Sequence, residues 1–186
     1  PSVTVAVIDS GICADHPDLA GRIETGWDFL EADPVPQDEF GHGCAVAGVI
    51  AANANNGVGI IGVAPNAQIM PLRVLDASGI GSYSDVAAAI VYAVDNGAQI
   101  INLSLGGIRY SALEQSTITA ARNAGVIIVA AAGNSGDETV HYPAGYEGVV
   151  SVSAVDGQAE RAYYSSYGAS VDVAAPGGDT GSDLDG

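Results

Sequence analysis

The stretch VTVAVIDSG, residues 3–11, decides the class of fold. Val3 to Ile8 is short, apolar and rich in β-branched residues, which is typical of a buried strand. The turn-favouring residues Asp9, Ser10 and Gly11 end this strand. An acid therefore follows directly on a buried strand, which is the position where the strands of open parallel sheets gather their ligands.

Apolar strand-like runs alternate with helical stretches along the rest of the chain. Apolar runs predict further strands over 69–74, 100–105, 126–131 and 149–155. Helices are predicted over 42–52, over 84–96 with Ser82 or Ser84 as N-cap, and from the capping-box pair Ser111 and Glu114 to Gly125. Residues 30–40 are acidic and contain prolines, which indicates a surface loop. Strands joined by crossover helices predict one α/β domain over residues 1–186 with a mostly parallel sheet.

Composition limits the partners that the chain can have. Its 186 residues are 48% hydrophobic, carry a formal charge of −17 and include no lysine. Such an acidic chain repels phosphate backbones and anionic lipid surfaces, so we expect neither nucleic acid nor membrane partners. No apolar run reaches the length of a membrane-spanning helix. The charge is compatible with secretion, calcium binding or a saline habitat, and equally with a merely soluble acidic surface.

Three polar side chains occupy positions that suit acyl transfer by a serine. Such chemistry needs a base, a group that orients the base, and donors for the oxyanion. Asp9 suits the orienting role, His42 between two glycines suits the base, and Asn134 suits the oxyanion donor. Taken singly, each has a structural alternative: a turn aspartate, a buried imidazole, and an asparagine in a Gly-Asn-Ser-Gly turn.

Taken in order, the segments VIDSG (7–11), GHG (41–43) and AAGN (131–134) resemble the subtilisin-like serine proteases, the subtilases. The resemblance runs from Val3 to Gly177. It implies a three-layer, doubly wound α/β fold and an Asp-His-Ser endopeptidase that cleaves polypeptides. Asp9, His42 and Asn134 would then take the three roles just described.

The nucleophile of that family is not in this sequence. The family serine lies in a Gly-Thr-Ser-(Met/Ala)-x-x-Pro motif, which does not occur here. We therefore expect a fold that is incomplete at the C-terminus, with exposed apolar sheet surface, and a chain that is inactive alone. The serine would come from residues outside this sequence or from a second polypeptide. An inactive subtilase-like fragment or a peptide-binding module is the alternative.

The resemblance also implies where a substrate binds. An extended peptide would lie as a strand between the segments 78–81 and 104–107. The segments 104–107 and 130–133 would form the two walls of the primary specificity pocket. Tyr83 would cover a more distant subsite, and His141 would stand at the base of the primary pocket. The implied substrate-binding residues are Gly79, Ile80, Gly81, Tyr83, Ser104, Leu105, Gly106, Gly107, Ala131, Gly133 and His141.

Calcium and a disulfide complete the expectations. The resemblance implies a structural calcium site with the side chains of Asp18 and Asn56 and the carbonyls of Ala54, Val58 and Ile60, a fitting oxygen set for that ion. An Asn-Gly turn without metal is the alternative.

The chain has two cysteines, Cys13 and Cys44, close in sequence to Asp9 and His42. In a secreted protein we expect them to form a disulfide, rather than two unpaired core residues.

Overall fold

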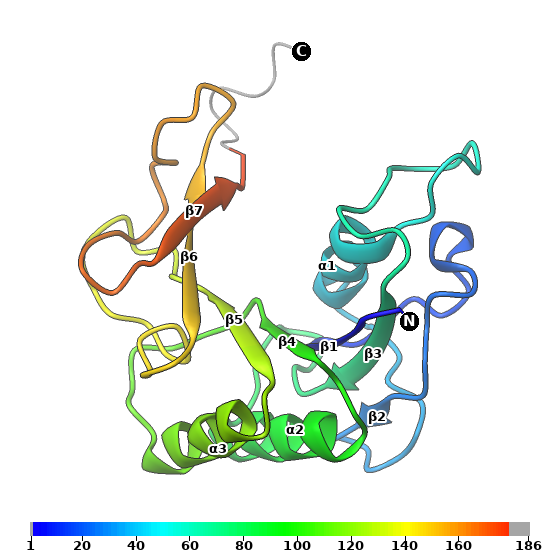
Figure 1. The fold of residues 1–186 in the computed structure, drawn as a ribbon, viewed down its shortest axis with the longest axis horizontal. Helices are drawn as coiled ribbons and strands as arrows, with labels where there is room; N and C mark the ends of the chain where they lie inside the picture. The colour runs from blue at the N-terminus through cyan, green and yellow to red at the C-terminus, as the bar shows by residue number, and fades with distance from the viewer. Residues whose placement is uncertain (1, 179–186) are drawn as a thin grey trace.

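A seven-stranded sheet forms the centre of the structure, a computed structural model that describes residues 2–178 (Figure 1). The strand order is β2-β3-β1-β4-β5-β6-β7, and every neighbouring pair is parallel. The strands are β1 (Thr4–Asp9), β2 (Trp27–Asp28), β3 (Gln68–Arg73), β4 (Ile100–Leu103), β5 (Ile127–Ala131), β6 (Val150–Val155) and β7 (Val173–Pro176). The predicted parallel α/β sheet is confirmed, and β2 and β7 are additions that the sequence patterns did not predict.

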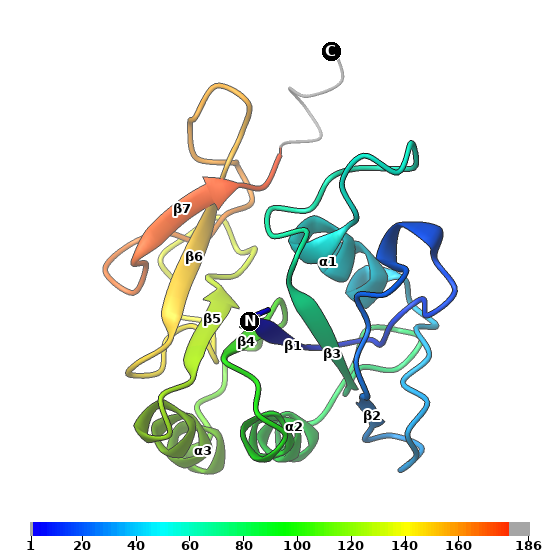
Figure 2. The same cartoon turned by 45° about the vertical axis from the view of Figure 1, so that its right-hand side comes forward.

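Helices lie on both sides of this sheet. α2 (Tyr83–Asp95) and α3 (Ala112–Asn123) pack side by side on one face, and α1 (His42–Ala51) lies on the other (Figures 1 and 2). A short 3-10 helix, η1 (Pro17–Leu19), lies beside α1. Ser82, and not Ser84, caps α2, because its side chain accepts a hydrogen bond from the Asp85 amide. The three layers predicted from the resemblance are present over β1 and β3.

Only one of the two hydrogen bonds of the predicted capping box at α3 is present. The Ser111 hydroxyl accepts from the Glu114 amide at 3.3 Å, as a capping serine does. The Glu114 carboxylate, however, does not bond back to the Ser111 amide. Tyr146 stands between them: its hydroxyl accepts from the Ser111 amide at 2.8 Å and donates to Glu114 Oε2 at 2.7 Å. A residue 32 positions further along the chain thus completes the motif.

The side chains of β1 point alternately to two covered faces of the sheet, which explains why its sequence is apolar throughout. Successive side chains of a strand point to opposite faces, so a strand covered on both sides is apolar at every position. Ala6 and Ile8 belong to the core cluster under α2 and α3, whereas Val5 and Val7 belong to the cluster under α1. Asp9, the next residue, is equally buried at the carboxyl end of the strand.

The α1 side of the sheet is covered over one half only. α1 contacts β1 and β3, and Figure 1 shows no described helix on that side of β5, β6 and β7. Ile127 of β5 and Val173 of β7 are 55% and 50% exposed, whereas Ile128, which faces α2 and α3, is buried. Register aligns Val129 with Val150, and Ala131 with Val152. The expected exposed apolar sheet surface is therefore present in the described chain.

Candidate active site

Asp9 and His42 form a hydrogen-bonded pair at the carboxyl end of β1. Asp9 Oδ1 lies 2.8 Å from His42 Nδ1 and also accepts from the Ser10 amide at 2.7 Å. Because a carboxylate only accepts, this contact assigns the proton to Nδ1 and leaves Nε2 as the free acceptor of the ring. The hydrogen bond to Asp9 raises the pKa of His42 above its usual 6.5, against the lowering effect of burial.

Glycines allow the two elements to approach so closely. His42 is the first residue of α1, and a β-carbon on Gly43 would overlap the carbonyl oxygen of Gly11, in the turn after β1. Gly11 itself has φ = +120°, which L side chains rarely adopt, and a β-carbon there would lie 2.7 Å from the Pro36 carbonyl. The glycines that flank Asp9 and His42 in sequence are thus needed to bring these two side chains together.

Asp38 ties the turn after β1 to the start of α1. Its Oδ1 accepts from the Gly41 amide at 2.7 Å and from the Ser10 hydroxyl at 2.9 Å, and its Oδ2 accepts from the Cys44 amide at 2.8 Å. The Ser10 hydroxyl in turn accepts from the Gly43 amide. Burial raises the pKa of Asp38, but these donors outweigh it and hold the pKa below its usual value. Asp38 was predicted only as part of a surface loop, so this role was missed.

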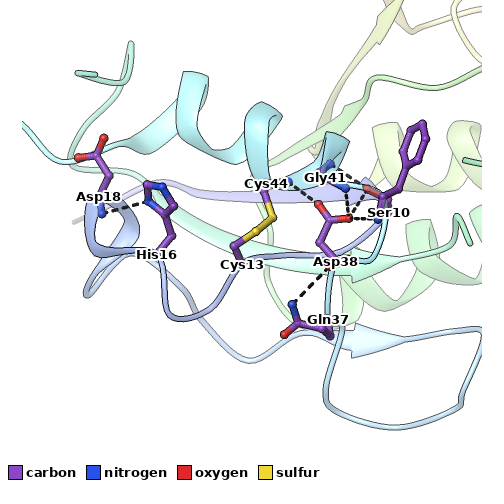
Figure 3. Close-up of a disulfide and its surroundings, with 10 residues drawn as sticks. Ser10, Cys13, His16, Asp18, Gln37, Asp38, Gly41 and Cys44 are labelled. Carbon is purple, nitrogen blue, oxygen red and sulfur yellow. Dashed lines mark hydrogen bonds between the residues drawn. A yellow bond between two sulfur atoms is a disulfide. The ribbon is translucent and has the colours of Figure 1, made fainter. Parts of the chain in front are cut away.

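The disulfide between Cys13 and Cys44 is formed, with 5.4 Å between the Cα atoms (Figure 3). It joins the chain just after Asp9 to the first turn of α1, two residues beyond His42. Figure 3 shows Asp38 beside it, with its hydrogen bonds to the same turn. Within the described chain these two sulfurs and Asp38 are the only group of three candidate metal ligands, and sulfurs bonded to each other are not thiolates.

A cavity of about 410 Å³ opens beside His42. Tyr83 and the two glycine-rich segments predicted to clamp a peptide all line it, together with Phe40 and Glu114. Of the predicted substrate-binding residues it brings together Gly79, Ile80, Gly81, Tyr83, Ser104, Leu105, Gly106 and Gly107. Such a volume is within the range of ligand-binding clefts.

Asn134 lies in a second cavity, of about 470 Å³, next to the uncovered sheet face. Ala131 and Gly133 line it too, and Ser104 lines both cavities. Asn134 is exposed, and no described hydrogen bond joins it to Asp9 or His42. The structure thus brings Asp9 and His42 into contact. Asn134 lies apart from them, in a separate cavity that shares Ser104 with the cavity beside His42.

His141 lines neither of these cavities. Its Nε2 lies 2.7 Å from the Ser135 hydroxyl, and its ring packs so closely on Gly133 that a β-carbon there would overlap it. The next residue, Tyr142, approaches the glycine-rich segment 104–107, since it forms an antiparallel bridge with Gly107. The imidazole is therefore held against the loop that carries Asn134.

The loop at 54–60 folds over Asp18. Asp18 is 3% exposed, and its carboxylate accepts from Asn56 Nδ2 at 2.8 Å and from the Ile60 amide at 3.0 Å. Gly59 has φ = +52°, and a β-carbon on it would overlap Asp18 Oδ2. No Arg or His side chain of the described residues forms an ion pair with Asp18. A buried carboxylate without a cationic partner among the described residues, beside a loop that carries further oxygen ligands, fits Ca²⁺, which binds carboxylate, amide and carbonyl oxygens.

Comparison with known proteins identifies the family. The chain matches the subtilase family, peptidase S8, over residues 1–185. The chain belongs to the subtilase family. Among subtilases it is 46% identical to thermitase of Thermoactinomyces vulgaris over 173 residues, which cover 93% of this chain and 62% of that protein. It is 47% identical to a thermophilic serine proteinase of Bacillus sp. (strain AK1) over 182 residues, covering 98% of this chain and 45% of the relative.

Solved structures confirm the subtilase fold. The structure of proteases from Pseudoalteromonas arctica PAMC 21717 superposes with a TM-score of 0.89 at 38% identity, over 95% of this chain and 63% of the other. A cold-adapted subtilisin-like serine proteinase gives a TM-score of 0.86 at 34% identity, over 94% and 62%. This subtilase chain thus spans less than two thirds of the relatives described here. No described helix is long and apolar enough to cross a membrane.

Proposed function

We propose that this chain forms the Asp-His part of a secreted serine endopeptidase whose nucleophilic serine lies outside this sequence. The observation that carries the proposal is the 2.8 Å contact between Asp9 Oδ1 and His42 Nδ1, with Nε2 free beside a cavity. Membership of the subtilase family supports it. Secretion is supported by the disulfide, which persists in oxidising compartments.

In the proposed reaction, His42 Nε2 takes the proton of the serine hydroxyl as the oxygen attacks the peptide carbonyl. Asp9 holds the ring in the tautomer that makes this possible and stabilises the imidazolium that forms. The amide group of Asn134 donates to the oxyanion, a contribution of about 3–4 kcal/mol in comparable enzymes. His42 then returns the proton to the leaving amine.

The substrate would be a polypeptide held as an extended strand. The segments 79–81 and 104–107 line one cavity together with His42, so a peptide between them can pair through its backbone. Tyr83 would cover one subsite, Ala131 and Gly133 would line the primary pocket, and His141, which packs on Gly133, would support that pocket. The net charge of −17 disfavours nucleic acid and anionic membranes as partners.

The uncovered half of the sheet supports a serine-bearing segment as the missing part. Ile127, Val129 and Val173 would otherwise leave an apolar face in water. Asn134 lies at the edge of the cavity on this face, so a segment covering the face can present its serine to both Asn134 and the His42 side. This segment would belong to the same polypeptide or to a second one.

Calcium would support the fold rather than the reaction. Asp18 and Asn56 would supply side-chain oxygens, and Ala54, Val58 and Ile60 their carbonyls, as the family resemblance implies. The ion would neutralise a carboxylate that is buried without a cationic partner among the described residues. The loop already folds around Asp18 through the Asn56 and Ile60 contacts, so the ion would stabilise an arrangement that exists.

Labelling of the full-length protein with a tagged fluorophosphonate tests the proposed function. We expect label on a serine outside this sequence, located by mass spectrometry of the labelled peptide. The His42→Ala variant should label orders of magnitude more slowly, because the hydroxyl loses its base. A full-length protein that folds and takes up no label would instead be an inactive subtilase or a peptide-binding module.

A further inference from the structure

The cavity beside His42 also reaches a buried carboxyl group, that of Glu114. Glu114 lies in the first turn of α3 and is 1% exposed. The lining of this cavity is largely apolar and aromatic. It includes Leu75, Ile80, Tyr83, Val86, Leu105 and Tyr142.

Only one oxygen of this carboxyl group is occupied. Oε2 accepts from the Tyr146 hydroxyl at 2.7 Å, and Tyr146 in turn accepts from the Ser111 amide. Burial raises the pKa of Tyr146, so this hydroxyl stays protonated and remains a donor. Oε1 accepts no hydrogen bond from any described side chain or amide. One acceptor therefore remains available at the end of an apolar cavity.

Glu114 forms no ion pair with any residue that the structure describes. No arginine of the described chain lines the cavity, and lysine is absent from the sequence. A carboxylate removed from water is costly unless a cation pairs with it, and burial accordingly raises the pKa of Glu114. Glu114 takes part in the Ser111 cap only through Tyr146, which contacts Oε2 and leaves Oε1 directed to no described donor.

We propose that Glu114 makes the cavity a subsite for a basic side chain, lysine or arginine, of the polypeptide substrate. The inference rests on the proposed function, because it assigns a specificity to that same cleft. The aliphatic stem of such a side chain would pack on Leu105 and Val86, and its charged end would reach Glu114 Oε1. Tyr83 and Tyr142 add aromatic faces, which attract cations.

Peptide cleavage by the full-length protein tests this subsite. Substrates carry arginine, lysine, norleucine or glutamate at one position in turn on the N-terminal side of the scissile bond, in an otherwise alanine background. The variant Glu114→Gln keeps an oxygen for Tyr146 and removes the charge. Glu147→Gln removes the same charge from an exposed neighbour of Tyr146 that does not line the cavity, and serves as the matched control. Melting temperatures of all variants check the fold.

We expect a basic residue at one position to raise kcat/KM over norleucine by roughly 10- to 100-fold. Glu114→Gln should abolish that preference, so that the arginine, lysine and norleucine peptides are cleaved with similar kcat/KM, and Glu147→Gln should retain it. The inference is overturned if cleavage shows no basic preference at any position, or if the preference survives in Glu114→Gln.

A binding measurement separates this inference from the proposed function. Fluorescence anisotropy of the same labelled peptides on the wild type and on Glu114→Gln requires no cleavage. If no peptide is cleaved, the proposed function fails, and the arginine-over-norleucine ratio in binding still decides the inference. A ratio near one in the wild type refutes it.

Discussion

Removal of the Cys13–Cys44 disulfide should destabilise the fold and disturb the Asp9–His42 pair together. The two cysteines are 31 positions apart, and the chain-entropy relation for a loop of this length gives about 3.7 kcal/mol at 25 °C. The double variant Cys13→Ser, Cys44→Ser should lose this amount of unfolding free energy. Because the bridge connects the chain after Asp9 to the helix that begins at His42, its loss also loosens the contact between their side chains.

The measurement is urea unfolding of the full-length protein at fixed calcium concentration, with His42→Ala present in every sample to prevent self-digestion. The His42→Ala chain that keeps both cysteines, treated with a reductant, is the matched control and should unfold at the same urea concentration as the double variant. In the His42-containing protein, kcat/KM should fall and its acid limb should shift to lower pH, because His42 loses the partner that raises its pKa. A loss below about 1 kcal/mol with an unchanged pH profile would refute the reasoning.

Three further predictions concern individual side chains. Asp38→Ala removes acceptors of the Gly41, Cys44 and Ser10 groups, so thermal unfolding should show a loss of about 1–2 kcal/mol; an unchanged Tm would contradict the capping role. The acid limb of kcat/KM should lie above pH 6.5, because hydrogen bonding to Asp9 raises the pKa of His42. By linkage, the protonated His42 contributes stability fully below about pH 6.5, so the excess stability of wild type over His42→Ala should shrink as pH rises through the folded pKa; a constant excess would contradict the pairing. Calcium should raise the Tm of wild type and not that of Asp18→Asn, as scanning calorimetry with and without chelator can show, and equal shifts in both proteins would place the ion elsewhere.

Local patterns predicted the elements that bury continuous apolar runs. β1, β3, β4, β5 and β6 were each found within a residue or two of their ends, because such strands are long enough to be recognised in a sequence. β2 has two residues and β7 ends on Pro176 at the edge of the described sheet, so neither has a periodic signal. Their existence depends on pairing with β3 and β6, which sequence spacing does not reveal.

The site was predicted where short motifs carry it and missed where contacts are long-range. Asp9 and His42 follow directly from the segments VIDSG and GHG. Asp38 was hidden in an acidic loop, although an Asp three residues before Gly41 is a plausible cap, and its bond to Ser10 spans 28 positions. Arg73, which is 6% exposed and pairs with Asp28 and Glu39, gave no local signal because both partners are distant in sequence.

The strand order has a consequence for biosynthesis. β5, β6 and β7 each add beside the strand made just before, so this part of the sheet can assemble in the order in which the ribosome delivers it. Synthesis proceeds at about 5–20 residues per second, so the segment from Ile127 to Pro176 emerges over several seconds. During that time the apolar face of β5, β6 and β7 is exposed to solvent. A chaperone that binds nascent strands would therefore act on these strands rather than on β1 and β3, which α1 already covers.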